Sequence, residues 1–301
     1  MKGNTTSALL SSRPFIILDG AMGTELERRG FRTPLPLWSA MANLEAPVLV
    51  KQIHDDYIAA GADVITSNTF RTTAHTFAKV NKATLASHLT KLAVEIARES
   101  IVQSDRTVLL AGSLAPLEDC YSPELVPVDE VIHDAYMEQI DLLISTGVDF
   151  ILAETMINHR EITFISEYLH QKEFPFIMSF TAQDGRLLDG TPLESVIPDV
   201  TDKNPLGLLL NCRSCAQITK TLPVLHDLFH GVSGAYANGS GHPDNILGWK
   251  IEDGSINDYL ASVNQWLERG ALLIGGCCGT PPEHIAAIYE LRERIYETVK
   301  H

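Results

Sequence analysis

The sequence predicts a (β/α)₈ barrel, an α/β fold built as a single domain. Eight short apolar runs recur along the chain, and segments with helical spacing separate most of them. The runs are rich in Ile, Leu, Val and Phe and mostly end in small or polar residues, which is typical of parallel strands buried on both faces. The length of 301 residues, of which 45% are hydrophobic, is enough for one large core.

Each predicted element has its own sequence signal. The strands are expected, in chain order, at residues 15–22, 63–70, 107–114, 149–156, 175–182, 206–213, 230–237 and 271–278. Apolar residues at helical spacing predict helices at residues 47–62, 89–103, 128–148, 160–171, 216–229, 256–270 and 282–299. Gly147 and Gly270 end two of these helices, as C-terminal cap residues do.

Three connecting segments depart from the regular alternation. Residues 183–205 have the weakest helical pattern, and residues 70–88 and 239–255 are expected to be functional loops. Because no change in composition marks a second domain, we expect a lead at 1–14 followed by one barrel at 15–299.

A doubly wound sheet is the alternative fold, and it requires a nucleotide-binding glycine loop after the first strand. The segment Gly20-Ala-Met-Gly23 has two glycines instead of three. This weak signal favours the barrel.

The composition excludes several classes of partner. The formal net charge is -15 and no basic block is present, so we expect neither nucleic acid nor an anionic membrane surface as a partner. No stretch approaches the ~18 apolar residues that a membrane span needs, and the first residues do not resemble a signal peptide. We therefore expect a soluble, cytoplasmic protein.

Chemically capable residues gather at the predicted strand ends, which converge on one face of a barrel. They are Asp19, Asn68, Glu154, Cys212, Cys277 and Cys278. None of the 11 histidines falls at a strand end, which argues against a histidine-based site. An ionised carboxylate at the position of Glu154 would need a cationic partner, whereas Asp19-Gly20 is also compatible with a plain turn.

The cysteines allow three interpretations. Cys212, Cys277 and Cys278 would hold zinc with one position open for an exchangeable ligand, because soft thiolates select this metal. With Cys215 of the Cys212-Arg-Ser-Cys215 segment they would form a closed four-cysteine site. They would otherwise be inert core thiols. A disulfide between the adjacent Cys277 and Cys278 lies outside ordinary disulfide geometry.

Seven segments that span nearly the whole chain carry recognisable motifs. They are LDGAMGTELERRG (18–30), PLWSA (36–40), GADVITSNTF (61–70), AETM (153–156), LDGTPLES (188–195), LLLNC (208–212) and GGCCGTPPEHI (275–285). In this order they resemble the homocysteine S-methyltransferase family. The paired Gly-Gly-Cys-Cys-Gly with the upstream Asn-Cys is highly specific. The resemblance implies a (β/α)₈ barrel that binds homocysteine.

The resemblance also implies a site. One zinc per chain would be held by the three cysteines that map onto Cys212, Cys277 and Cys278, whereas Cys215 matches no ligand of the family. The substrate contacts map onto Asp19, Gly20 and Glu154, around the amino and carboxyl groups of homocysteine. One departure is Tyr236-Ala237-Asn238, where relatives commonly have Tyr-Pro-Asn. This change predicts a different loop over the methyl donor.

The function expected from this resemblance is methionine formation from L-homocysteine. A zinc-bound thiolate would attack the methyl group of a small sulfonium such as S-methylmethionine, with S-adenosylmethionine as a weaker donor. The chain ends about twenty residues after Cys278, without the extra domains of folate- and corrinoid-using methionine synthases or the assembly extension of betaine-using relatives. The absence of these extensions favours a sulfonium donor, and we separately expect a monomer.

Aromatic side chains near the barrel rim, such as Trp38, Phe70 or Tyr236, would hold the sulfonium by cation–π contact or would simply belong to the core. Two alternatives to the sulfonium-dependent enzyme remain at this point. The chain would be a homocysteine-activating subunit that receives its methyl group from betaine or from a corrinoid or folate partner protein, or it would be a non-catalytic zinc-bearing barrel.

Overall fold

The computed structural model describes residues 12–244, 246, 248–252 and 254–299. Its central sheet has eight parallel strands in the order β1-β12-β9-β8-β5-β4-β3-β2. The strands are β1 (Ile16–Ile17), β2 (Val64–Thr66), β3 (Leu109–Leu114), β4 (Phe150–Met156), β5 (Phe176–Phe180), β8 (Gly207–Ser214), β9 (Ser233–Asn238) and β12 (Leu273–Ile274). A parallel bridge between Leu18 and Val64 joins the two ends of the sheet. The predicted (β/α)₈ barrel is confirmed.

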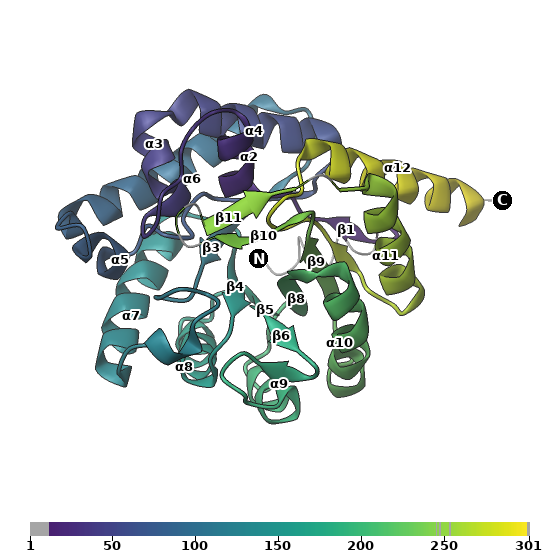
Figure 1. The fold of residues 1–301 in the computed structure, drawn as a ribbon. Coiled ribbons are helices and arrows are strands. Elements are labelled where there is room, and N and C mark those ends of the chain that lie inside the picture. The colour runs from purple at the N-terminus through teal and green to yellow at the C-terminus, as the bar shows by residue number, and fades with distance from the viewer. Residues whose placement is uncertain (1–11, 245, 247, 253, 300–301) are drawn as a thin grey trace.

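A helix follows each strand and covers the outside of the sheet (Figure 1). The eight are α4 (Pro47–Ala60), α6 (Ala86–Gln103), α7 (Asp129–Thr146), α8 (His159–Gln171), α9 (Leu193–Thr201), α10 (Cys215–Leu228), α11 (Ile256–Glu268) and α12 (Pro282–Val299). Seven coincide with predicted helices, and α9 lies within 183–205, where the pattern was weakest. Gly147 and Gly270 have φ of 81° and 92°, the left-handed conformation expected of residues that end helices.

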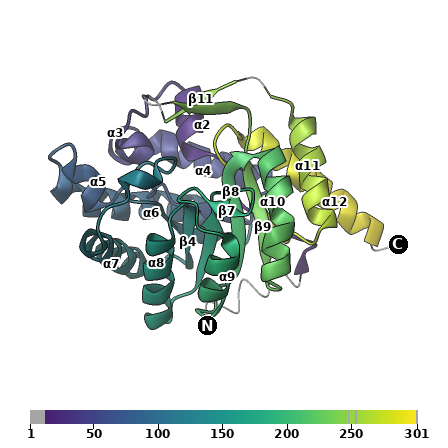
Figure 2. The ribbon, with the colours of Figure 1, turned by 60° about the horizontal axis from the view of Figure 1, so that its bottom comes forward.

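Several short elements lie in the connections at the carboxyl end of the barrel. They are α2 (Met22–Arg28), the 3₁₀ turn η1 (Trp38–Met41), α3 (Ala42–Glu45), α5 (Ala74–Ala78), the 3₁₀ turns η2 (Ala83–Leu85) and η3 (Pro123–Leu125), and the hairpins β6 (Ala182–Gln183)–β7 (Arg186–Leu187) and β10 (Gly241–Asp244)–β11 (Gly248–Ile251). The second hairpin lies across the barrel mouth in Figure 1, and Figure 2 shows β11 beside α2.

The first and last strands are shorter than predicted. The first was expected to run to residue 22, but the chain leaves the sheet after Leu18 and enters α2 at Met22. The last was expected to run to residue 278, but β12 ends at Ile274. Beyond that residue the Cys277 carbonyl accepts a hydrogen bond from the Thr280 amide at 3.1 Å, so the chain turns instead of extending.

Alternate strand residues build two layers of core. Ile16, Leu18, Phe150, Leu152 and Leu209 belong to a cluster inside the barrel, whereas their neighbours along the strands pack outward against the helices. Cys277 packs on the inner cluster, so the barrel filling ends directly at the cysteine group.

Two expectations concern the chain as a whole. The predicted lead at 1–14 falls mostly on residues 1–11, which lie outside the described residues, and its boundary with the barrel stays a prediction. None of the helices in the described ranges combines the length and apolarity needed to cross a bilayer.

Candidate active site

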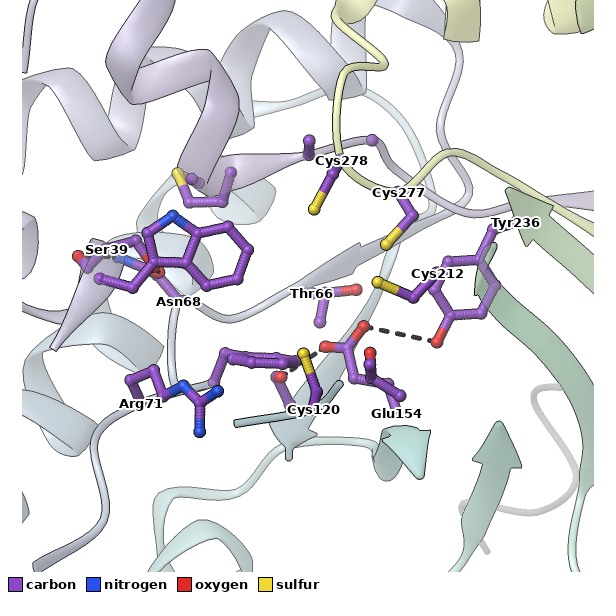
Figure 3. Close-up of a pocket in the computed structure, with 18 of the residues that line it drawn as sticks. Ser39, Thr66, Asn68, Arg71, Cys120, Glu154, Cys212, Tyr236, Cys277 and Cys278 are labelled. Carbon is purple, nitrogen blue, oxygen red and sulfur yellow. Dashed lines mark hydrogen bonds between the residues drawn. The ribbon is translucent and has the colours of Figure 1, made fainter. Parts of the chain in front are cut away.

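Three cysteine thiols meet at the carboxyl end of the barrel. Cys212 comes from β8, and Cys277 and Cys278 come from the turn after β12. The three sulfur atoms all lie within 4.8 Å of one another, and Figure 3 shows them pointing into the same pocket. The structure therefore brings together the three residues that the sequence singled out as ligands.

A β-bulge turns Cys212 toward the pocket. Leu209 faces the barrel interior, so strict alternation would point Asn211 inward and Cys212 outward. The register of β8 shifts between Asn211 and Ser214, and Cys212 has φ of 57°, in the left-handed region. Bulges re-aim side chains in this way, and here the bulge delivers the thiol to the inside.

The backbone of the turn after β12 fixes the other two cysteines. The Cys277 amide donates to the Ala237 carbonyl at 2.9 Å, and the Cys278 carbonyl accepts from the Gly239 amide at 2.8 Å. Gly279, with φ of 74°, then reverses the chain. The adjacent cysteines are thereby held against the end of β9 and both reach the pocket.

The surroundings of the thiols are largely apolar. Trp249 is buried with Cys212 and Cys278, and Trp38 and Tyr121 pack against this cluster. The hydrogen bond with Cys212, followed by burial, raises the pKa of the Cys278 thiol well above its ordinary value. Crowded thiols resist ionisation on their own, so a bound cation is what would make them thiolates.

The carboxyl groups of Asp19, which is buried, and Glu154, which is half-buried, line the same pocket. Asp19 accepts hydrogen bonds from the Thr66 amide at 2.7 Å and the Thr66 hydroxyl at 3.0 Å. Glu154 accepts from the Ser113 hydroxyl at 2.5 Å and from the Tyr236 hydroxyl at 3.4 Å. No basic side chain of the described ranges forms an ion pair with either carboxyl group.

Burial without a cation changes the acidity of both groups. It raises the pKa of Asp19 to about 8, and the charge of Glu154 adds to this effect. Burial likewise raises the pKa of Glu154 to about 7. Both sites would become normal carboxylates if a positively charged group entered the pocket.

Gly20 lets the backbone form part of the pocket wall. A Cβ atom at this position would stand 2.3 Å from the Thr280 carbonyl oxygen and 2.7 Å from the ring of Tyr57. Glycine is therefore required here by close packing, which is more specific than the Asp-Gly turn that the sequence left open.

The side chain of Asn211 in β8 links this strand to β4, a role that the sequence prediction missed. Its Oδ1 accepts from the Thr155 amide at 3.0 Å and the Ser179 hydroxyl at 2.7 Å, and its Nδ2 donates to the Thr155 hydroxyl at 2.9 Å. Thr155 follows Glu154 and has φ of 61° within the bulge of β4. The Asn-Cys pair in the sequence was the available signal, but it identified only the cysteine.

The loop 115–128 after β3 also reaches the site, which the sequence did not predict. The Tyr121 hydroxyl lies 3.0 Å from the Cys212 sulfur. Cys120 is buried and lines the same cavity, and its interaction with the Cys212 thiol lowers the pKa of Cys120. Cys215, in contrast, starts α10 and contacts the Asn238 carbonyl at 3.9 Å, so it does not join the group of three.

The three clustered cysteines, the two carboxyl groups, Cys120 and Tyr121 line one cavity of about 230 Å³. Its wall includes the three aromatic residues that the sequence suggested for a cationic donor, namely Trp38, Phe70 and Tyr236. Trp38 and Phe70 pack edge to face with ring centroids 5.5 Å apart, whereas the Tyr236 hydroxyl is bound to Glu154. The predicted functional loops at 70–88 and 239–255 both contribute to the wall, through Phe70 and Pro243.

The fold and the site together define a class of (β/α)₈-barrel enzyme in which three clustered cysteine thiols lie beside the carboxyl groups of Asp19 and Glu154. Comparison with known proteins identifies the family. A sequence model of the homocysteine S-methyltransferase family matches residues 16–292. This protein belongs to the homocysteine S-methyltransferase family, as the resemblance in its motifs indicated.

Individual relatives match over nearly their full length. The homocysteine S-methyltransferase of Escherichia coli is 32% identical over 310 residues, covering 95% of this chain and 98% of that protein. A selenocysteine methyltransferase of Astragalus bisulcatus is 29% identical, with 91% of each chain covered. The metallated crystal structure of the Escherichia coli homocysteine methyltransferase MmuM superimposes with a TM-score of 0.82 at 30% identity, covering 94% of this chain and 98% of that one.

Proposed function

We propose that this protein transfers a methyl group from S-methylmethionine to the sulfur of L-homocysteine, giving methionine, with one zinc ion held by Cys212, Cys277 and Cys278. S-adenosylmethionine is a weaker donor in this proposal. The observation that carries it is the position of the three thiols, which share one cavity with two carboxyl groups that lack a cation.

The cysteine group fits a zinc ion. Three sulfur atoms within 4.8 Å of one another offer soft ligands on one side of the cavity, and their apolar surroundings favour a bound metal over hydrated thiolates. When bound, the metal would keep the acceptor thiol deprotonated at neutral pH, which makes it a good nucleophile.

The carboxyl groups suit the amino end of homocysteine. An ammonium group near Glu154 and Asp19 would supply the missing cation and lower the raised pKa of each carboxyl group, so binding and ionisation would support one another. Gly20 lines the same cavity, so its backbone is available to contact the substrate carboxylate. These contacts fix the acceptor so that its sulfur meets the donor methyl in line.

The remaining wall suits a cationic donor. The Trp38–Phe70 pair offers aromatic faces beside the thiols, and the protein has a net charge of -15. A sulfonium departs as a neutral thioether, so the cavity need not provide a proton to the leaving group.

The test is methionine formation by the isolated, zinc-loaded chain with homocysteine and one donor at a time. We expect turnover with S-methylmethionine, less with S-adenosylmethionine, and none with betaine or methylated folate. Turnover with betaine or folate alone would overturn the donor and leave the acceptor intact. Activity only after a corrinoid protein is added would identify a homocysteine-activating subunit, and zinc binding without any methyl transfer would identify a non-catalytic barrel.

A further inference from the structure

One positively charged side chain lines the cavity that contains the cysteine group. Arg71 follows Phe70 in the 70–88 loop and is 6% exposed. It is the only Lys, Arg or His among the described residues that line this cavity. Figure 3 shows it across the pocket from Cys277 and Cys278. Arginine is rarely buried to this extent unless an anion pairs with it, so the counter-ion of Arg71 has to be identified.

The protein itself satisfies the guanidinium of Arg71 only in part. Its Nη1 donates to the carbonyl oxygens of Pro116 at 3.0 Å and Glu118 at 2.7 Å. Its Nε is buried and has no hydrogen-bond partner in the described ranges. No carboxylate of those ranges forms an ion pair with Arg71, and the carboxylate of Glu118 pairs with His75 and Lys79. Backbone carbonyls therefore fix the side chain but supply no counter-ion.

Glu161 is a buried carboxyl group that senses the charge of Arg71 without pairing with it. Burial raises the pKa of Glu161, and the charge of Arg71 opposes this shift without reversing it. The Glu161 Oε1 accepts hydrogen bonds from the Leu117 amide at 3.0 Å and the Tyr136 hydroxyl at 2.7 Å. Glu161 thus has hydrogen bonds of its own and leaves the guanidinium available to a ligand.

The aromatic contacts of Arg71 connect it to the wall proposed for the methyl donor. The guanidinium carbon lies 5.1 Å from the centroid of the Phe70 ring, and Phe70 packs edge to face against Trp38. Arg71 and the rings that would contact a sulfonium therefore form one continuous part of the wall. In S-methylmethionine a short aliphatic chain joins the sulfonium to a carboxylate, which is the group that a guanidinium fork binds best.

We propose that Arg71 binds the carboxylate of the methyl donor and thereby selects sulfonium donors that carry one. This inference rests on the proposed methyl transfer from a sulfonium to homocysteine. The acceptor has other partners in that proposal, since Glu154 and Asp19 face its ammonium group and the backbone of Gly20 contacts its carboxylate. Arg71 is then left for the second amino acid in the cavity. It touches no reacting atom, so it acts on the binding and orientation of the donor.

A pair of donors tests the assignment on the zinc-loaded full chain. S-methylmethionine is compared with its carboxamide, which keeps the sulfonium and the amino group but loses the negative charge. We expect the wild-type kcat/KM to be about 10–100-fold higher for S-methylmethionine, mainly through a lower KM for the donor. In Arg71→Gln this ratio should fall close to one, and Arg71→Lys, which keeps the charge without the fork, should retain part of it.

The ratio separates donor binding from a purely structural role of Arg71. If Arg71 only ties the 115–128 loop through Pro116 and Glu118, Arg71→Gln should slow both donors equally and keep the wild-type ratio, which would overturn the inference. Arg98→Gln is the matched control, because Arg98 also donates to a backbone carbonyl, that of Gly147 at 2.9 Å, but is not among the described residues that line the cavity. It should keep the wild-type ratio.

Two further outcomes locate a failure. A wild-type ratio near one would overturn the inference without any variant having to fold, and it would leave the proposed methyl transfer standing. Transfer from neither donor would instead refute the proposed function, and the inference with it. The acceptor is checked with 3-aminopropanethiol, which lacks the carboxylate of homocysteine. If Arg71→Gln abolishes the preference for homocysteine over this thiol and keeps the donor ratio, Arg71 binds the acceptor and the donor assignment is wrong.

Discussion

Asp63 and Asp19 are buried carboxyl groups at opposite ends of the same pair of neighbouring strands, and their surroundings differ completely. Asp63 directly precedes β2, at the amino end of the barrel, and forms ion pairs with Arg13, Arg106 and Arg292. Asp19 follows the first strand, at the carboxyl end, and within the described ranges its side chain accepts hydrogen bonds from Thr66 and forms no ion pair.

The difference separates a structural carboxylate from one suited to a ligand. Three guanidinium groups compensate the buried charge of Asp63, and the Ile17 amide also donates to it at 2.9 Å. Asp19 has no such compensation, and burial raises its pKa to about 8. We therefore expect substitutions at the amino end to change stability, and substitutions at the carboxyl end to change binding and catalysis.

The largest effect should follow loss of a proposed metal ligand. Cys277→Ser should abolish both zinc binding and methyl transfer, while the zinc-free variant unfolds at the same temperature as zinc-free wild type. Metal content and methionine formation measure this, and Cys215→Ser should retain both. If Cys215→Ser loses zinc as fully as Cys212→Ser does, a closed site containing Cys215 is correct and the proposed mechanism is wrong.

Removing the carboxylate at the opposite end should damage the fold. Asp63→Ala leaves three guanidinium groups without their shared partner and should lower the free energy of unfolding by about 3–5 kcal/mol. Denaturant unfolding of the zinc-free protein measures the loss. The folded fraction should keep the wild-type KM for homocysteine, and a raised KM there would mean that the two ends are not independent.

Glu154→Ala should weaken homocysteine binding by roughly 2–5 kcal/mol, because the substrate ammonium would lose a desolvated partner. Zinc content should stay close to the wild-type value. The KM for homocysteine measures the effect. As a matched control, thiols that lack an amino group should be poor acceptors for the wild type, and Glu154→Ala should use them no less well than the wild type does. An unchanged homocysteine dependence would make Glu154 a structural residue.

The last prediction is a pH dependence of stability that comes from Asp19. Because its pKa rises from 3.8 to about 8 on folding, the folded state binds more protons than the unfolded state between these values. Its ionisation therefore costs nothing below about pH 4, and stability is lost as the pH rises to about 8. Relative to wild type, the stability of Asp19→Asn should increase progressively as the pH rises between these limits. Urea unfolding at several pH values, without zinc or homocysteine, checks this, and parallel curves would disprove it.

The alternation of strands and helices was predictable because burial on both faces gives strands a continuous apolar composition, and amphipathic helices repeat at their own period. The cysteines could be located because they follow such strands directly. Strand alternation also places Glu154 correctly, because it lies two residues after Leu152 and therefore points to the inside of the barrel as Leu152 does.

What the sequence could not reveal depends on irregular backbone. Strict alternation gives the wrong side for Cys212, since only the bulge turns it inward. Cys120 and Tyr121 lie in a loop whose path is set by tertiary contacts with Cys212 and not by local periodicity. The β10–β11 hairpin and α2 were missed for a different reason, because short polar segments carry little periodic signal.

The side chain of Asn211 couples the bulge of β4 to the bulge of β8. Its Oδ1 accepts a hydrogen bond from the backbone amide of Thr155 in β4, and Asn211 itself directly precedes Cys212, which has the left-handed conformation in β8. A substitution at either bulge would shift the geometry in which the other is tolerated, so paired changes at positions 155 and 211 should depart from additivity. Mutational paths through this region are therefore epistatic, so whether a substitution at one bulge is tolerated depends on the residue already present at the other.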